Sequence, residues 1–530
     1  MRGSELFRQW VGFLCAFLFE PWRDARLIWL VVGTFFLISA YLHAVVMAPG
    51  TDVAWLLVAA DRLIAGGTYL EDFYEPNAPL AILIYCPGVY VARLLGLNPY
   101  MGFLITVYLS IGASIYVVRS MSRRLFSDRA LQSGVLTVAC AACLLIAPRT
   151  VFGQREHIAM VLFLPFIVAI AARDAGRHRN PRSVEIGISA AAAVGSFIKP
   201  YLVLMPIALF LVALLRKRSL RVVLRSDFQT FFLAGIVYIF VIVLFFPGWL
   251  AVAKVASQLY GAHDGEWTTI LPSAISGIVL SGIILIASRF VALLPTDAAL
   301  SRAFAAAAIG ALIAVVIQNK GWGYHYYPAR VALFVLLAMF LAAFAAKFDP
   351  SPMLPRVRRQ GFRGLPVSIA VLVIAYWHLS GGHHTLDRYH HAPLTQMVRT
   401  TKPGASIFIF SNYIGDGFPL VILEKRAWAS RFPFLWPLPG LVHQLSTART
   451  TPRREHLLSL RRHTIKMTVA DFQRYHPDVV IVRVDLSSFG FKEPFDFLSF
   501  YRTDPAFEEI WRRYRLAGRI SNYELYVRSE

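Results

Sequence analysis

Charged side chains stand at the ends of long apolar blocks in this sequence, where they could do chemistry at a membrane surface. Asp52 directly follows the first block. A carboxylate held at a membrane–water boundary can accept a proton from a reacting hydroxyl group. The other interpretation is structural, because Asp suits the N-cap of a helix that would start near Val53. Asp52 is therefore a candidate for chemistry, with helix capping as the alternative.

Basic side chains form a second group beside the apolar blocks. Arg155 precedes one block, Lys199 lies at a tight turn between two blocks, and Lys320 and His325 share one short loop. Charges so close to apolar segments are costly and tend to be functional. The alternative is that they anchor the chain by extending their charged ends to the interface. Glu156 is expected to pair with its neighbour Arg155.

Apolar helices that cross a membrane must position these residues. Of the 530 residues, 57% are hydrophobic and 16% are charged, against about 45–50% and about 25% in soluble domains. The apolar residues gather in blocks long enough to cross a hydrocarbon core about 30 Å thick. We predict an α-helical polytopic membrane protein with about twelve spans, near 27–47, 79–96, 101–118, 134–147, 158–172, 185–198, 200–215, 229–247, 271–287, 303–317, 331–346 and 365–380.

The formal net charge is +22, and the basic residues that produce it are unevenly distributed among the loops. Arg and Lys concentrate in alternate loops, such as 119–129 and 216–225, whereas the first loop after span one carries mainly Asp and Glu. Loops rich in Lys and Arg face the cytoplasm. This pattern predicts a cytoplasmic N-terminus and argues against nucleic acid as the partner. An even number of spans then places the C-terminal region outside the cytoplasm.

From about residue 381, the long apolar blocks give way to a mixture of shorter strand-like and helix-like segments. Residues 406–410 and 479–484 are typical of strands, 453–475 and 504–515 of helices, and 524–527 of a last strand. The sequence therefore predicts a transmembrane domain at 1–380 and a soluble α/β domain at 381–530. In the first outer loop, residues 53–65 are expected to form a helix along the membrane surface.

The first outer loop continues as Gly66-Gly67-Thr68-Tyr69-Leu70-Glu71-Asp72 and then enters span two through Pro76 and Pro79. This layout resembles the polyprenyl-phosphate-sugar glycosyltransferases of the GT-C superfold. In that family an acidic residue just after span one is followed by an amphipathic helix, a G-x-x-Y-x-D-like stretch and a Pro-rich entry to span two. The stretch from Lys320 to Pro328 resembles the family's late outer loop.

The resemblance implies roles for the residues singled out above. Asp52 would be the catalytic base that takes the proton of the acceptor hydroxyl. The leaving phosphate needs fixed positive charge, which Lys199, Arg155, His325 and Lys320 would supply. Sugar or acceptor contacts are expected from Glu75, Asn77 and Tyr74, with a purely structural role in the loop as the alternative.

Four histidines, His383, His384, His390 and His391, surround Asp387 after the last predicted span. Such a cluster could bind a metal, but a polar helix leaving the membrane explains it as well. We therefore expect no metal and no other cofactor.

The function implied is an inverting glycosyltransferase in a bacterial inner membrane. Its donor would be a polyprenyl-phosphate sugar, and its acceptor an extracytoplasmic glycan or lipid, such as a lipopolysaccharide component or a cell-wall glycan, or a protein. The alternative is a transporter or flippase for lipid-linked saccharides. Repeated halves with broken spans, which are typical of transporters, are not evident in the sequence.

Overall fold

The computed structural model of the chain describes residues 20–177, 180–291, 294–347, 385–485 and 490–529. Contacts within the chain define two compact units. Unit 1 comprises residues 1–45, 104–239 and 265–382, and unit 2 comprises residues 46–103, 240–264 and 383–530. Unit 2 therefore joins the first outer loop and a second loop to the C-terminal region.

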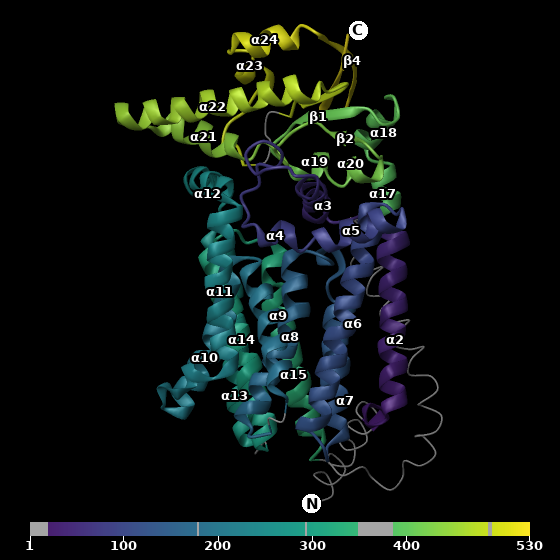
Figure 1. The fold of residues 1–530 in the computed structure, drawn as a ribbon, viewed down its shortest axis with the longest axis vertical. Helices are drawn as coiled ribbons and strands as arrows, with labels where there is room; N and C mark the ends of the chain where they lie inside the picture. Colours follow the sequence, from purple (N-terminus) through teal and green to yellow (C-terminus); the bar gives the residue numbers. More distant parts are fainter. Residues whose placement is uncertain (1–19, 178–179, 292–293, 348–384, 486–489, 530) are drawn as a thin grey trace, which may run out of the picture. The chain divides into compact units, whose positions relative to one another are not determined.

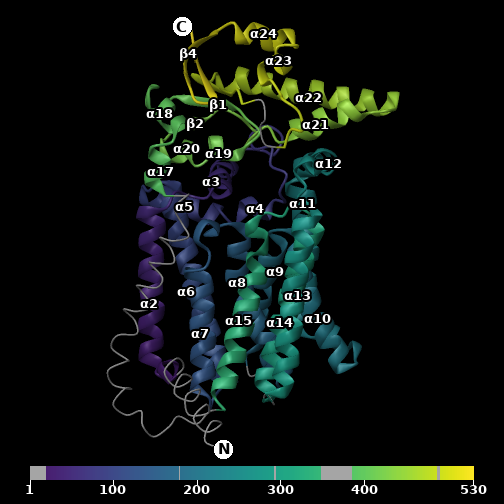
Figure 2. The ribbon, with the colours of Figure 1, turned by 180° about the vertical axis from the view of Figure 1, so that it is seen from behind.

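Unit 1 is a bundle of long apolar helices (Figures 1 and 2). Two of these helices, α6 and α11, continue past its boundary into segments of unit 2. The helices are α2 (Ala25–Tyr41), α6 (Pro99–Leu125), α7 (Ala130–Leu145), α8 (Arg155–Asp174), α9 (Arg182–Phe197), α10 (Leu204–Lys217), α11 (Ser226–Phe245), α13 (Trp267–Phe290), α14 (Pro295–Gln318) and α15 (Tyr327–Ala345), with short helical turns η1 (Glu20–Arg23), η2 (Leu42–Val46), η3 (Arg149–Val151), η4 (Pro200–Val203), η5 (Leu220–Leu224) and η7 (Gly323–Tyr326).

Within the described residues, 8 helices are long and apolar enough to cross a membrane. The expectation of a multi-pass helical membrane protein is therefore confirmed. The segments expected near 79–96, 134–147 and 185–198 form shorter helices, and the span expected at 365–380 lies outside the described residues. The number twelve stays a prediction.

Small residues let the helices of unit 1 pack closely. Helix α14 is rich in buried alanine and packs against α8, α10, α13 and α15. A Cβ atom at Gly310 of α14 would come within 2.5 Å of the carbonyl oxygen of Leu204, at the start of α10. Close approach of this kind is typical of helices that associate in a membrane.

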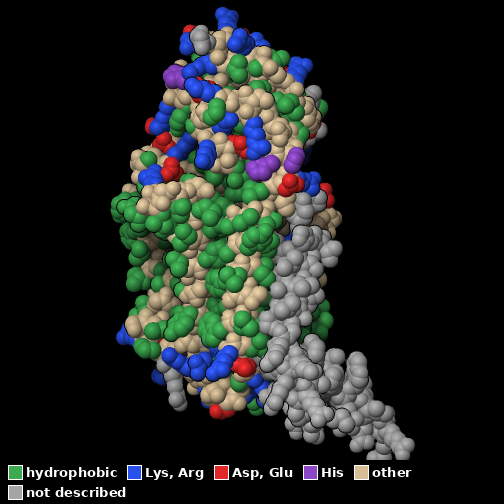
Figure 3. Space-filling view, turned by 90° about the vertical axis from the view of Figure 1, so that its right-hand side faces the viewer, with side chains coloured by type: hydrophobic (Ala, Val, Ile, Leu, Met, Phe, Trp, Pro, Cys, Tyr) green, Lys and Arg blue, Asp and Glu red, His purple; other side chains and the backbone are tan. Residues whose placement is uncertain are grey.

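The surface of the bundle is consistent with contact with lipid. Figure 3 shows side chains over the helices that are mostly hydrophobic, with Lys and Arg gathered at the lower end of the bundle. Helix α11 exposes Phe232, Ile239, Phe240 and Leu244 among others. A helix that exposes large apolar side chains over its length needs an apolar solvent.

Unit 2 contains a five-stranded sheet in the order β2-β1-β3-β5-β4. Strand β1 pairs in parallel with β2 and β3, and β5 pairs antiparallel with β3 and β4. The elements are α3 (Thr51–Ile64), α4 (Leu80–Leu83), α5 (Cys86–Leu95), α12 (Pro247–Leu259), η6 (Tyr260–His263), α17 (Leu386–His390), α18 (Pro393–Arg399), β1 (Ser406–Phe410), α19 (Ile414–Gly417), α20 (Leu420–Leu423), β2 (Ala427–Trp428), α21 (Pro437–Thr447), α22 (Thr451–Tyr475), β3 (Val479–Arg483), α23 (Phe497–Tyr501), α24 (Pro505–Trp511), β4 (Tyr514–Ile520) and β5 (Tyr523–Arg528).

Aromatic rings form the core on one face of this sheet. Phe410 of β1 lies 6.0 Å from Phe472 of α22 and 5.1 Å from Tyr501 of α23, measured between ring centroids. Phe507 of α24 completes the cluster at 5.9 Å from Phe410. The strands and the long helix predicted for this region are confirmed, and the mixed helix and strand content agrees with the α/β expectation.

One local prediction was wrong. The helix expected at 504–515 ends at Trp511, and the chain then enters strand β4. Strand β4 is largely exposed and lies at the sheet edge, so it lacks the apolar alternation by which strands are recognised. The helix expected at 53–65 forms as α3, with Val53, Trp55 and Leu57 all buried within the chain. Its place along the membrane surface stays a prediction.

Candidate functional site

The basic residues singled out in the sequence gather in unit 1. The ammonium of Lys199 donates to Nε2 of His325 at 3.1 Å and forms an ion pair with the carboxylate of Glu156. Arg155, Lys199 and Lys320 all act electrostatically on His325. The structure therefore brings together all four residues that were predicted to bind a phosphate. Glu156, which was expected to pair with Arg155, pairs with Lys199.

Breaks between helices place these side chains together. Arg155 and Glu156 open α8, Lys199 lies in the gap between α9 and η4, and His325 lies in η7 just before α15. Lys320 is carried by a loop that reverses at Gly321, whose φ of 66° lies in the left-handed region that glycine favours. Arg155, Glu156, Lys199 and His325 are all buried.

The contact between Lys199 and His325 defines a proton position. An ammonium group can only donate, so Nε2 of His325 must accept and the imidazole proton lies on Nδ1. This Nδ1 is buried, and it has no hydrogen-bond partner in the described part of the chain. A buried N–H donor without an acceptor is costly, so this donor favours an incoming acceptor atom.

The charge of the cluster also favours an incoming acceptor group, in particular an anion. Arg155, Lys199 and Lys320 carry positive charge, and Glu156 is the carboxylate that pairs with Lys199. The ring of Tyr324 lies 4.9 Å from the ammonium of Lys199 and adds a cation–π contact. A concentration of positive charge at one place attracts anions. The chemistry that this arrangement supports is the binding of a phosphate or another oxyanion.

Asp52 lies in unit 2, in the first turn of α3. The N-cap of that helix is Gly50, with no side-chain cap, so the capping alternative for Asp52 is wrong. Its carboxylate acts electrostatically on Tyr413, which follows β1 in the C-terminal region. Asp52 is only partly buried. Its carboxylate lies at the positive end of a helix, which stabilises its negative charge.

Glu75, Asn77 and Tyr74 are held by contacts within unit 2. Glu75 accepts from the indole N–H of Trp55 at 2.6 Å and from the backbone N–H of Asn77 at 2.9 Å. Tyr74 is buried, with its ring 5.7 Å from that of Trp436 and nearly parallel to it. Burial raises the pKa of Tyr74 to about 12, which Arg431 partly opposes. These contacts favour the structural alternative for Glu75 and Tyr74.

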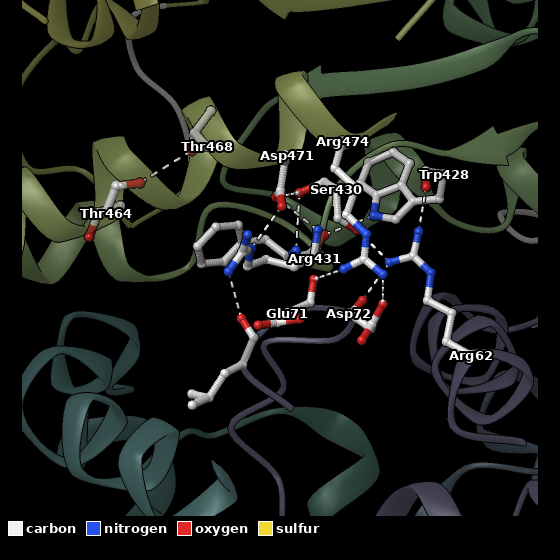
Figure 4. Close-up of polar contacts among 12 residues, drawn as sticks. Arg62, Glu71, Asp72, Trp428, Ser430, Arg431, Thr464, Thr468, Asp471 and Arg474 are labelled. Atoms are coloured by element: carbon white, nitrogen blue, oxygen red, sulfur yellow. Dashed lines mark hydrogen bonds and ion pairs between the residues drawn. The ribbon is translucent and has the colours of Figure 1, made fainter. Parts of the chain in front are cut away.

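A polar network fastens the first outer loop to the C-terminal region (Figure 4). Arg62 of α3 donates to the carbonyl of Asp72 at 2.5 Å and to that of Ser430 at 2.7 Å. Arg431 pairs with Asp471 of α22 at 2.7 Å and donates to the carbonyl of Leu70 at 2.6 Å. This network fixes the loop that follows α3, and so the helix that carries Asp52.

A second group near Asp52 was missed by the sequence reasoning. Asp416 accepts hydrogen bonds from Ser411 at 2.5 Å, from Tyr523 at 2.8 Å and from Arg483 at 3.1 Å. Burial raises the pKa of Tyr413; Asp416 and Asp52 add to the rise, and Arg483 opposes it. Ser411, Tyr413 and Asp416 follow β1, Arg483 ends β3 and Tyr523 begins β5. No sequence motif marked these residues.

A metal site finds no support in the described residues, where no three His, Cys, Asp or Glu side chains lie together as metal ligands would. Of the predicted histidine cluster, His390, His391 and Asp387 are described, and Nδ1 of His391 lies 3.6 Å from the carboxylate of Asp387. His383 and His384 lie outside the described residues.

The fold of the chain is similar to that of a solved membrane-protein structure, which agrees with the helical multi-pass fold expected from the sequence. Among solved structures it is similar to ArnT from Cupriavidus metallidurans bound to undecaprenyl phosphate. The identity is 13% and the TM-score 0.51, and the match covers 94% of this chain and 97% of that chain. It is also similar to the same protein in the apo state, with 12% identity, a TM-score of 0.41 and coverage of 94% and 96%. No protein-family model and no curated protein matches the sequence.

Proposed function

We propose that the chain is an inverting glycosyltransferase that moves a sugar from a polyprenyl-phosphate donor to an acceptor outside the cytoplasm. The observation that carries this proposal is the cluster of Arg155, Lys199, Lys320 and His325, in which all but Lys320 are buried. It occurs in a chain with the fold of a protein whose structure contains undecaprenyl phosphate.

The cluster of unit 1 binds the phosphate of the donor. Lys199 is held by Glu156 and by the ring of Tyr324, so its ammonium is oriented before the donor arrives. The Nδ1–H of His325 donates to a phosphate oxygen and so gains an acceptor, which none of the described residues provides. Preorganised donors of this kind stabilise the charge that develops on a leaving group.

Asp52 of unit 2 is the base. As the acceptor oxygen bonds to C1 of the sugar, its proton passes to the carboxylate of Asp52. The bond between C1 and the phosphate oxygen breaks, and the electron pair leaves with polyprenyl phosphate. Because one displacement takes place at C1, the configuration inverts. The reaction needs no redox partner.

The cellular setting follows from the topology predicted by the charged loops. The donor lies in the outer leaflet of a bacterial inner membrane, and the acceptor is a glycan, a lipid or a protein of the cell envelope. The N-terminus is cytoplasmic, and the C-terminal region of unit 2 lies outside.

Sugar transfer by the purified protein tests the proposal. The protein in lipid nanodiscs is incubated with radiolabelled polyprenyl-phosphate sugars and with a membrane extract that supplies acceptors. We expect label to leave one donor for an acceptor, and the double variant Lys199→Met/Glu156→Gln to transfer none. Movement of intact lipid-linked sugar across liposomes, without transfer from any donor, would contradict the proposal and identify a transporter.

A further inference from the structure

In the sheet of unit 2, two neighbouring strands are followed by connections that run to opposite sides. In other open sheets, ligands bind at such a point. Strand β1 connects to β2 on one side, and the chain after β3 continues to β4 and β5 on the other side. Ligands of open α/β sheets bind at the carboxyl ends of strands, where the connections diverge in this way. In unit 2 that point lies between the carboxyl ends of the parallel strands β1 and β3.

Asn412 is the second residue past the carboxyl end of β1, and its side chain is buried without a partner. Its exposed fraction is 0%. Neither the amide oxygen nor the amide nitrogen has a hydrogen-bond partner among the described residues. Buried amides are nearly always satisfied, so this amide is free to bind a group that is not part of the chain.

The neighbours of Asn412 are fixed by other contacts. Ser411 and Arg483 both bind Asp416, at 2.5 and 3.1 Å. The Nε atom of Arg483 is buried and also has no hydrogen-bond partner among the described residues. The region between the carboxyl ends of β1 and β3 therefore contains the amide of Asn412 and the Nε–H of Arg483, and neither has a hydrogen-bond partner among the described residues.

The next residue, Tyr413, adds an aromatic surface to the same loop. Its side chain is 43% exposed, and a Cβ atom at Gly415 would overlap its ring. Asp52 lies close enough to act electrostatically on Tyr413. The candidate base and this aromatic surface therefore belong to one region of unit 2.

We infer that Asn412, Tyr413 and Arg483 form the acceptor subsite, and that the acceptor group bound there is a sugar ring. A primary amide donates and accepts, so it can bind two neighbouring hydroxyl groups of a sugar. An exposed tyrosine ring offers an apolar face with a polar edge. An anion is disfavoured, because Asp52 and Asp416 are carboxylates and Asp416 neutralises Arg483.

This inference rests on the proposed function and adds to it a class of acceptor, a saccharide. It also predicts an effect on stability that differs from the effect expected if Asn412 only stabilised the fold. Replacing an unsatisfied buried amide by an apolar group of similar size removes a cost to the folded state. Asn412→Leu should therefore leave the protein as stable as the wild type, or more stable, while it abolishes binding.

Binding of simple sugars in the absence of donor tests the inference. Saturation-transfer NMR is recorded on the full chain in nanodiscs with a panel of methyl glycosides and disaccharides. We expect wild type and the exposed-amide control Gln473→Leu to bind at least one sugar. Asn412→Leu and Tyr413→Ala should bind it about tenfold more weakly or not at all, and the unfolding temperature of Asn412→Leu should not fall.

Three outcomes would overturn the inference. First, wild type could bind no sugar of the panel, and the partner of the amide would then be a buried water. Second, Asn412→Leu could bind sugar as well as wild type does. Third, Asn412→Leu could unfold at a clearly lower temperature, which would show that the amide stabilises the fold. Because binding is read without a donor, a failure of transfer from polyprenyl-phosphate sugars is a separate result.

Discussion

At the scale of single residues, the main feature is the contact between Lys199 and His325. The ammonium fixes the tautomer of the imidazole and leaves its Nδ1–H without an acceptor in the described chain. Glu156 holds the ammonium in place, and it is almost fully buried. Removing Lys199 alone would leave the buried carboxylate of Glu156 without its ion-pair partner. A test of the role of Lys199 therefore needs both residues to be changed together.

We predict that Lys199→Met/Glu156→Gln loses affinity for undecaprenyl phosphate by about ten- to a hundredfold, because charge-assisted hydrogen bonds to the phosphate disappear. Its unfolding free energy should stay near that of wild type. The single variant Lys199→Met should lose about 3–5 kcal/mol, because it leaves a buried charge unpaired.

Binding to protein in nanodiscs and urea unfolding measure the two effects. Lys254→Met, which removes an exposed lysine of α12, is the matched control and should bind as wild type does. Equal affinity of the double variant and wild type would show that the cluster does not hold the phosphate.

At the scale of elements, long-range contacts fix the helix that carries Asp52. The loop after α3 is tied to α22 through Arg431 and Asp471 (Figure 4). Both side chains of this pair are buried, whereas the neighbouring pair of Arg474 and Asp72 is half-exposed on its arginine side. Burial raises the pKa of Asp471, and the charge of Arg431 opposes that rise.

We predict that Asp471→Asn destabilises unit 2 by about 3–5 kcal/mol, because Arg431 is left buried without its carboxylate. The control Arg474→Gln removes a half-exposed arginine and leaves Asp72 with its hydrogen bond from the backbone of Thr68, so it should cost less than about 1 kcal/mol. Urea unfolding followed by tryptophan fluorescence measures both. Similar losses in the two variants would contradict the assignment of Arg431 and Asp471 as the main tie.

A second set of contacts joins the three central strands β1, β3 and β5 and makes stability depend on pH. Asp478 precedes β3, and its carboxylate accepts from the backbone N–H of Ser406 at 2.9 Å and pairs with Arg528 at 3.3 Å. Burial alone would raise the pKa of Asp478. The hydrogen bonds from Ser406 and the charge of Arg528 outweigh burial and lower the pKa below its ordinary value of 3.8.

The sign of the effect follows from the lowered pKa. Stability from Asp478 is fully present above its unfolded pKa and is lost as the pH falls through its lower folded pKa. We predict that wild type is more stable than Asp478→Asn at pH 6 and that the difference shrinks below about pH 4. Unfolding free energies across this range measure it, and a difference that grows on acidification would refute the account.

At the scale of the whole molecule, the sequence predicts the membrane-embedded fold well. In the described part of the chain, eight apolar helices and the central strands appear where hydropathy and alternation place them. The grouping of the first outer loop with the C-terminal region was not predicted. It depends on contacts such as that between Arg62 and Ser430, which are 368 residues apart, and no local pattern encodes such a pairing.

The candidate site was predictable only in part. Lys199 and His325 stand out because a charge beside an apolar span is costly. The pairing of Glu156 with Lys199 and the unsatisfied amide of Asn412 are invisible in the sequence, because burial and missing partners are properties of the folded chain. Edge strand β4 was missed because its side chains are largely exposed.

The most direct test of the central claim is sugar transfer by Asp52→Asn. Asp61→Asn is the matched control, since Asp61 lies on the same helix but pairs with Arg93 at 2.6 Å on the exposed side. We predict that Asp52→Asn binds undecaprenyl phosphate as wild type does but transfers sugar about 10²–10⁴-fold more slowly. Asp61→Asn should transfer at nearly the wild-type rate. Equal rates for Asp52→Asn and wild type would contradict the account, because the acceptor proton would then leave without this carboxylate.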